Sequence, residues 1–152
     1  MANGGTGEGR LEPRIELTDA PPLGALQKIQ EPLRRFNREA AGESQARPLA
    51  VLLSDPQTDD IVGGLWGSTR WGFLQIDLLF IPEFLRRQRL GSKLIRMAEE
   101  EAIRRGCHVA WVGTYEFQAR GFYERLGYTV FGKLDGPPPV YPSYFLQKSL
   151  KA

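Results

Sequence analysis

This chain of 152 residues contains a single cysteine and a single histidine. One thiol, Cys107, cannot form a disulfide framework within the chain or a metal site of several cysteines. His108 has no second histidine as a ligand partner, so we interpret it as a structural residue at the start of a strand. A lone cysteine is compatible with a reducing compartment. Disulfide-stabilised and cysteine-ligated classes of protein are therefore excluded.

Long apolar runs are also missing. No segment approaches the roughly 20 apolar residues that a membrane-spanning helix needs. The first ten residues, MANGGTGEGR, have no apolar core of a secretion signal, and we interpret residues 1–13 as a flexible tail. We therefore expect a cytoplasmic protein with no membrane partner. The formal net charge of +2 is too small by itself to indicate a nucleic-acid partner, and we expect none.

The composition is that of a soluble globular protein, with 41% hydrophobic and 25% charged residues. The length suits one domain, which we assign to residues 14–152. A chain of this size buries about two-thirds of its unfolded surface, so it folds without disulfides or metals.

Apolar patterning predicts strands and helices in a mixed order. The predicted strands span residues 14–18, 48–53, 61–69, 73–81, 108–114, 128–134 and 144–150. Pro32 divides the helical pattern of residues 23–42, which predicts two short helices meeting near Gln30 and Glu31. Further helices are predicted over residues 90–106 and 118–126. Antiparallel hairpins therefore precede a β-α-β crossover, which indicates a mixed α/β fold with a central mixed sheet flanked by helices.

The helix predicted from Leu90 is amphipathic. Apolar residues share one of its faces: Leu94, Met97, Ala98 and Ala102. Charged residues lie largely on the other face: Lys93, Arg96, Glu99, Glu100 and Arg104.

A basic loop joins the strand that ends at Pro82 to the helix that begins at Leu90. A helix N-terminus presents unpaired N–H groups and about half a positive charge, which attract anions. Gly91 leaves the backbone approachable because it has no Cβ. The loop's arginines are Arg86, Arg87 and Arg89. These features predict a pyrophosphate site, and a solvated basic loop is the alternative.

Two segments resemble the GNAT acetyltransferases. Residues 86–91, RRQRLG, resemble the signature Q/R-x-x-G-x-G/A that wraps the coenzyme A pyrophosphate with backbone amides, although Arg89 stands in place of the middle glycine. Residues 114–132 resemble the region N-x-x-A-x-x-x-Y-x-x-x-G-F/Y, with Glu116 in place of asparagine. The matching residues of this second segment are Ala119, Tyr123, Gly127 and Tyr128. The resemblance extends over residues 14 to 150.

The resemblance implies a GNAT fold, in which the N-terminal strands are antiparallel and the family's parallel fourth and fifth strands splay apart. It implies transfer of an acetyl group from acetyl-CoA to a primary amine of a small molecule or peptide, by direct attack in a ternary complex and without a metal. It also implies which residues contact acetyl-CoA. These are Leu79, Phe80, Ile81, Arg86, Arg87, Gln88, Arg89, Leu90, Gly91 and Ser92.

Two residues are candidates for catalysis. Tyr123 matches the family tyrosine that protonates the departing thiolate, and a core aromatic is its alternative role. Asp77, the single ionisable residue in LQIDLLFI, is the candidate base for the amine. A family bulge in this strand leaves open which face Asp77 takes, and a structural acid is the alternative. Glu83 is a second candidate base.

The acceptor is not readable from the sequence. Residues that could line its site are Phe36, Asn37, Trp66, Trp71, Tyr141 and Tyr144, and packing within the fold is the alternative for at least half of them. A catalytically weak or inactive acyl-CoA-binding module remains a rival function, as does a nucleic-acid or protein-binding domain that uses the arginines. The sequence also leaves a homodimer open. The sequence contains neither the glycine pattern of a P-loop nor that of a dinucleotide-binding fold, which disfavours both of these folds.

Overall fold

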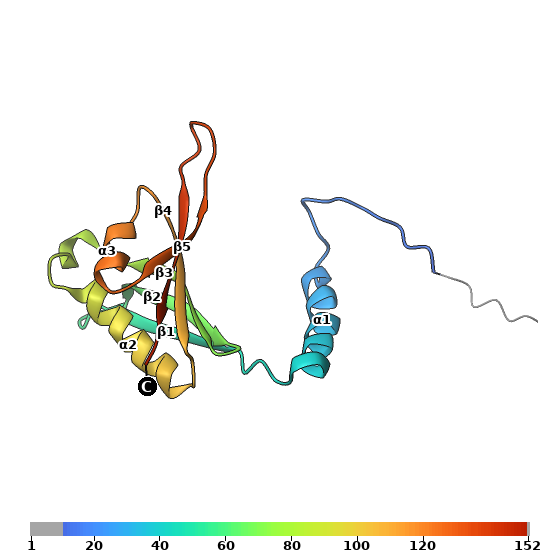
Figure 1. The fold of residues 1–152 in the computed structure, drawn as a ribbon, viewed down its shortest axis with the longest axis horizontal. Helices are drawn as coiled ribbons and strands as arrows, with labels where there is room; N and C mark the ends of the chain where they lie inside the picture. Colours follow the sequence, from blue (N-terminus) through green and yellow to red (C-terminus); the bar gives the residue numbers. More distant parts are fainter. Residues whose placement is uncertain (1–10, 152) are drawn as a thin grey trace, which may run out of the picture. The chain divides into compact units, whose positions relative to one another are not determined.

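The computed structural model describes residues 11–151, which separate into two compact units divided between Gly42 and Glu43 (Figure 1). Each unit is described by itself. Most of the predicted flexible tail, residues 1–10, lies outside the described residues.

The first unit contains one helix, α1 (Ala25–Ala41), so the prediction of two short helices is wrong. Pro32 lies inside this helix and removes one N–H donor, yet the helix continues past it. The helix ends at Gly42, whose N–H donates to the Arg38 carbonyl. Residues 14–18, predicted as a strand, have no regular secondary structure. None of the strand pairings among the described residues includes them, and an unpaired strand leaves backbone groups unsatisfied.

The second unit is built on a six-stranded mixed sheet with the order β1-β2-β3-β4-β6-β5. The strands are β1 (Arg47–Ser54), β2 (Ile61–Arg70), β3 (Phe73–Phe80), β4 (Val109–Tyr115), β5 (Thr129–Leu134) and β6 (Ser143–Ser149). Strands β3 and β4 are parallel, and the other neighbours are antiparallel. The predicted mixed sheet is confirmed, and the apolar segment 73–81 forms one of its central strands.

Two helices, α2 (Leu90–Arg104) and α3 (Arg120–Arg125), cover one face of this sheet (Figure 1). A short 3-10 helix, η1 (Glu83–Leu85), precedes α2. Buried residues of both helices and of five strands form one apolar core. Its members include Leu49, Leu65, Leu74, Ile76, Leu94, Ile95, Ala98, Ala110, Val112, Tyr123 and Leu146.

Glu99 is buried with the apolar residues of α2, so the prediction that it lies on the other face is wrong. The hydroxyl of Tyr128 donates to Glu99 Oε1 over 2.9 Å, and Lys148 Nζ lies 2.9 Å from Glu99 Oε2. These partners lie just before β5 and on β6. The helix pattern could not reveal them because they come from distant parts of the chain.

Asp77 forms a β-bulge in β3. Gly67 pairs with Ile76 and Trp66 pairs with Leu78, so Asp77 is an extra residue without a partner on β2. A bulge interrupts the alternation of side chains. As a result, Asp77 and Leu78 are both exposed.

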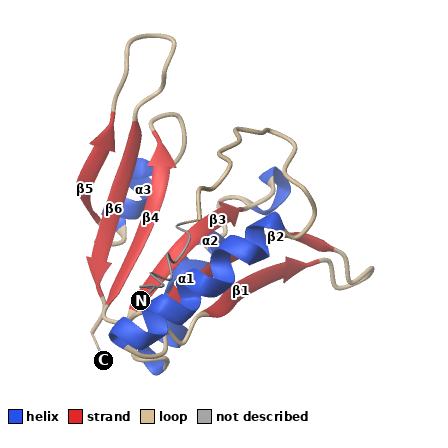
Figure 2. Cartoon of the chain, turned by 90° about the vertical axis from the view of Figure 1, so that its right-hand side faces the viewer, coloured by secondary structure: helices blue, strands red, loops and turns tan. Residues whose placement is uncertain are grey.

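The parallel pairing between β3 and β4 stops halfway along these strands. It runs from Phe73 with Val109 to Ile76 with Val112. β3 then continues to Phe80 and β4 to Tyr115, and Figure 2 shows the two strands diverging. The predicted splay is therefore present, and backbone groups at the ends of the two strands do not pair with each other.

Candidate active site

The N-terminus of α2 is shaped by Arg89, which has the left-handed conformation φ 55°, ψ 25°. No side chain caps the helix, and its first turn closes when the N–H of Lys93 donates to the Arg89 carbonyl. The N–H groups of residues 90–92 therefore have no partner within the helix. Glycine adopts a left-handed conformation most easily. Arg89, which stands in place of the middle glycine of the family signature, thus has a conformation that a glycine would adopt more easily.

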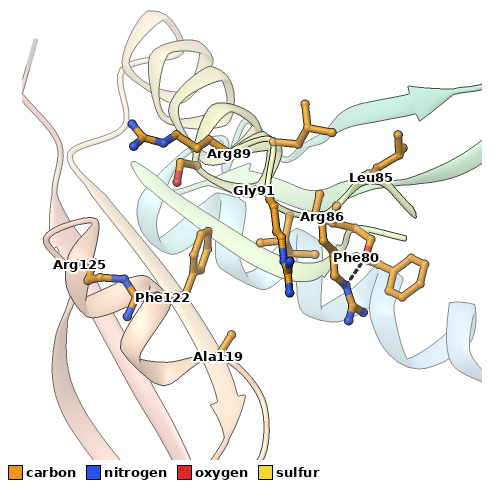
Figure 3. A pocket seen from close by; sticks show the side chains of 13 residues that line it. Phe80, Leu85, Arg86, Arg89, Gly91, Ala119, Phe122 and Arg125 are labelled. Carbon is orange, nitrogen blue, oxygen red and sulfur yellow. Dashed lines mark hydrogen bonds between the residues drawn. The ribbon is translucent and has the colours of Figure 1, made fainter. Parts of the chain in front are cut away.

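A cavity of about 750 Å³ lies beside this helix N-terminus (Figure 3). Four segments line it: residues 79–81, residues 85–87, residues 89–92, and three side chains at α3. All the residues that we predicted to contact acetyl-CoA line this cavity except Gln88. The Nε of Arg86 donates to the carbonyl of Ile81 over 3.2 Å, which ties the basic loop to the end of β3 (Figure 3).

The side chains at α3 were missed in the sequence. They are Ala119, Phe122 and Arg125, which follow one another at intervals of three residues and so share one face of the helix (Figure 3). This spacing could have revealed Phe122 and Arg125 in the sequence, because Ala119 matches the family region and the other two residues follow it on the same helix face. Arg125 adds a positive charge opposite the arginines of the loop.

Gly91 is needed where α2 approaches α3. A Cβ at this position would lie 3.1 Å from Cζ of Phe122 and 3.3 Å from its Cε2. Both residues line the cavity. A larger residue at position 91 would therefore move the Phe122 ring and change the shape of the cavity.

A second cavity, of about 360 Å³, occupies the gap between β3 and β4. It shares Leu79, Phe80 and Ala119 with the first cavity, so the two adjoin. Asp77 and Tyr123 both line it. The structure therefore brings together the two predicted catalytic residues and the end of the predicted cofactor site.

Tyr123 is 4% exposed, and its ring makes edge contacts with Phe122 and Tyr128 at centroid distances of 5.1 and 5.7 Å. Burial raises the pKa of Tyr123 to about 12. The hydroxyl therefore stays protonated at neutral pH.

Asp77 is held by a side chain on its own strand. Gln75 Nε2 donates to Asp77 Oδ1 over 2.8 Å, and Arg70 Nη2 donates to Gln75 Oε1 over 3.1 Å. Asp77 also lines a hollow of about 270 Å³ with Arg47, Trp66 and Arg70. It thus reaches both the gap between the strands and the side chains of β1 and β2. Glu83, the second candidate base, opens η1 and lines none of these three spaces.

Other candidate residues have structural surroundings. Cys107 is buried, which raises the pKa of its thiol, and the backbone N–H of His108 donates to Gly72. Tyr144 is buried beneath the Arg120 guanidinium, 4.3 Å from the ring centroid. Tyr141 is exposed. Phe36 and Asn37 belong to α1 in the first unit.

Neither a metal centre nor a membrane span is found in the described part of the chain. Over residues 11–151, no three His, Cys, Asp or Glu side chains gather as a metal site would require. In the same residues no helix has the length and apolar character to cross a membrane.

A family model, two related sequences and a solved structure all match acetyltransferases. The sequence model of the acetyltransferase (GNAT) family matches residues 16–128. Acetyltransferase Atu2258 of Agrobacterium fabrum is 40% identical over 121 residues, which cover 80% of this chain and 87% of that protein. Blasticidin-S acetyltransferase of Streptomyces morookaense is 38% identical over 134 residues, which cover 86% and 97%. A crystal structure from Agrobacterium tumefaciens, described as that of an acetyltransferase, has a TM-score of 0.84 at 36% identity and covers 90% of this chain and 98% of that one.

The mixed sheet with its split parallel pair, and the cavity at the start of α2, agree with this match. The chain belongs to the GNAT acetyltransferase family. It is an N-acetyltransferase, and the acetyltransferases from Agrobacterium and Streptomyces are its relatives.

Proposed function

We propose that this enzyme transfers the acetyl group of acetyl-CoA to a primary amine of a small molecule or peptide, by direct attack in a ternary complex. One observation carries the proposal. The cavity at the start of α2 adjoins the cavity between β3 and β4, and the second cavity is lined by both Asp77 and Tyr123. A donor that extends through the first cavity would bring its thioester to these two residues.

The first cavity fits a pyrophosphate. The N–H groups of residues 90–92 have no partner within the helix, and the helix dipole favours negative charge at this end. Arg86, Arg87, Arg89 and Arg125 line the same cavity and add positive charge. Backbone amides would hold the phosphate oxygens, and the arginines would attract the polyanion over a longer range.

The gap between the strands fits the amide-containing arm of coenzyme A. After Ile76, β3 has no partner on the side of β4, so its backbone groups are available to an extended ligand. Pairing of an extended ligand with a strand edge is a common mode of recognition. We assign this role to Leu79, Phe80 and Ile81, and those of their backbone N–H groups that point into the gap can also stabilise negative charge on the reacting carbonyl oxygen.

Asp77 and Tyr123 would divide the proton transfers. An alkyl amine is mostly protonated at neutral pH and must lose a proton before it attacks. Asp77 is exposed at the gap and can accept that proton, directly or through a water. Tyr123 is protonated at neutral pH and can donate to the departing thiolate. The thioester itself supplies the acetyl group, so no metal is needed for this transfer.

The relative named blasticidin-S acetyltransferase supports a small-molecule acceptor. Its match covers 97% of that protein, so the similarity is not confined to the donor site.

Two measurements test the proposal. Acetyl-CoA at a hundredfold excess over its Kd should stabilise the folded enzyme by about 2.7 kcal/mol, because it binds the native state. Thiol release with a panel of primary amines should then exceed the rate without amine. Absence of any thermal shift would contradict the donor assignment. Stabilisation without turnover of any amine would support an acyl-CoA-binding module instead.

A further inference from the structure

Three exposed aromatic rings gather at the end of β4 and the loop before β6. The aromatic cluster consists of Tyr115, Phe117 and Tyr141, which are 49%, 62% and 60% exposed. The rings of Tyr115 and Phe117 are stacked with a centroid distance of 5.4 Å and an interplanar angle of 8°. Tyr141 meets Phe117 edge to face at 5.0 Å. Burying these rings against a ligand would remove a large apolar area from water.

Hydrogen bonds fix the loops that carry the aromatic cluster. The backbone N–H of Glu116 donates to the Pro142 carbonyl over 2.9 Å and so joins the β4–α3 loop to the β5–β6 loop. The backbone N–H of Tyr115 donates to Gln118 Oε1, also over 2.9 Å. The backbone that carries the rings is therefore held in place before any ligand arrives, which lowers the entropy lost on binding.

The aromatic cluster is next in sequence to residues that line the cavity between β3 and β4, although none of its three rings lines that cavity itself. Thr114 and Gln118, which flank Tyr115 and Phe117 in the sequence, both line that cavity. Ile76 pairs with Val112, and both are buried on the side of the helices. Because side chains alternate along a strand, Tyr115 lies on the opposite face, where the bulge also exposes Asp77.

We propose that the aromatic cluster binds a flat, unsaturated ring of the acceptor, whose primary amine then reaches the gap beside Asp77. This inference rests on the proposed function and narrows its acceptor to amines on a short chain from an aromatic or heteroaromatic ring. Aromatic pairs are stabilised beyond the area that they bury, because the ring faces and edges carry opposite partial charge. A saturated ring of equal carbon number buries similar area without this interaction.

The test compares 2-phenylethylamine with 2-cyclohexylethylamine, which differ in the flatness and unsaturation of the ring. The inference predicts a kcat/KM that is about two- to tenfold higher for the aromatic amine. Phe117→Leu and Tyr141→Leu keep an apolar side chain and should each remove most of this preference. Phe131→Leu is the matched control, because Phe131 is an exposed ring on β5 whose ring neighbour is Phe145. It should keep the preference of the unaltered enzyme.

A binding measurement separates this inference from the reaction itself. With coenzyme A present, 2-phenylethylamine should shift the aromatic ¹³C-NMR signals of Phe117 and Tyr141. These signals are assigned by their loss from the spectra of Phe117→Leu and Tyr141→Leu. Such shifts without turnover of any amine would support binding of the ring at the aromatic cluster and contradict the proposed transferase reaction. Equal kcat/KM for the two amines, with no shift of these signals, would contradict binding of the ring at the aromatic cluster and would not contradict the proposed reaction.

Discussion

The side-chain amide of Gln75 connects Arg70 to Asp77. Its Nε2 donates to Asp77 Oδ1 over 2.8 Å, and its Oε1 accepts from Arg70 Nη2 over 3.1 Å. The arginine can only donate, so it fixes the amide with its NH₂ group toward the carboxylate. One carboxylate oxygen of Asp77 is therefore held in place, and Oδ2 remains available to a substrate.

Replacement of Asp77 tests its role as the base. Asp77→Asn keeps the shape of the side chain and removes its basicity. We expect kcat to fall by about 10²- to 10⁴-fold, with little change in the Kd of coenzyme A. The measurement is steady-state kinetics with a small primary amine. A kcat within about twofold of the unaltered enzyme would show that Asp77 is a structural acid.

Replacement of Gln75 tests whether it positions Asp77. We expect Gln75→Leu to lower kcat by roughly three- to tenfold, because the carboxylate loses its fixed orientation. In the double variant with Asp77→Asn, the additional loss should vanish, because Gln75 then has no base to position. Gln147→Leu, at an exposed glutamine on β6, is the control and should have no effect. Additive losses in the double variant would mean that Gln75 acts independently of Asp77.

Tyr123→Phe removes the hydroxyl and keeps the ring contacts with Phe122 and Tyr128. If this hydroxyl protonates the thiolate, kcat should fall by roughly ten- to ten-thousandfold. The Kd of coenzyme A should stay the same, because the lost interaction acts mainly in the transition state. Turnover close to that of the unaltered enzyme would show that Tyr123 is a packing residue and that solvent protonates the thiolate.

The same variant tests the effect of burial on the pKa. Tyrosine ordinarily ionises near pH 10.0, and Tyr123 in the folded enzyme ionises near pH 12. Between these values the folded state binds more protons, so this group's contribution to stability is complete below pH 10 and is lost as the pH rises toward 12. In this window the free energy of unfolding of Tyr123→Phe should fall less steeply with pH than that of the unaltered enzyme. The two slopes should differ by up to about 1.4 kcal/mol per pH unit. Urea denaturation at several pH values measures the slope, and equal slopes would contradict the shift.

Arg89 occupies a left-handed conformation that is costly for a residue with a Cβ. Arg89→Gly and Arg89→Ala both remove the charge, and only the first relieves the conformational cost. We expect the glycine variant to be more stable than the alanine variant by about 1 kcal/mol. Both should bind coenzyme A more weakly than the unaltered enzyme and to a similar extent. Chemical denaturation and a binding titration measure these effects, and equal stability of the two variants would argue against the left-handed geometry.

Glu99 is 7% exposed and receives hydrogen bonds from Tyr128 and Lys148. Glu99→Ala should lower the free energy of unfolding by about 3 kcal/mol, because it leaves a partly buried ammonium group and a buried hydroxyl without their partner. Glu100→Ala, at the exposed neighbouring position, should change stability by less than about 0.5 kcal/mol. Chemical denaturation of both variants measures the difference. A loss below 1 kcal/mol for Glu99→Ala would show that the buried pair contributes little.

Most of the second unit could be predicted from the sequence, because its patterns are local. Apolar periodicity and Pro82 predict the helix that starts at Leu90 and the strand before it. Most residues that line the first cavity lie where these two elements meet, so they could be predicted too. The single helix of residues 25–41 was missed because a proline normally ends a helix, whereas Pro32 is tolerated here.

Other features depend on contacts between distant residues, which periodicity does not record. The bulge at Asp77 arises from the register between β2 and β3, so the face of this carboxylate could not be predicted. Glu99 lies at a polar position by sequence, and its burial follows from the approach of Lys148 on β6. Arg125 likewise joins the first cavity because α3 packs beside the start of α2.

The split between β3 and β4 also bears on how well the protein stays in solution. Residues 77–80 and 113–115 form two strand edges inside the sheet, in addition to the outer edges of β1 and β5. Unpaired strand edges recruit strands of other molecules and promote aggregation. A ligand that lies along the inner edges occupies their backbone groups. Enzyme that is purified and concentrated with acetyl-CoA should therefore aggregate more slowly than the free enzyme.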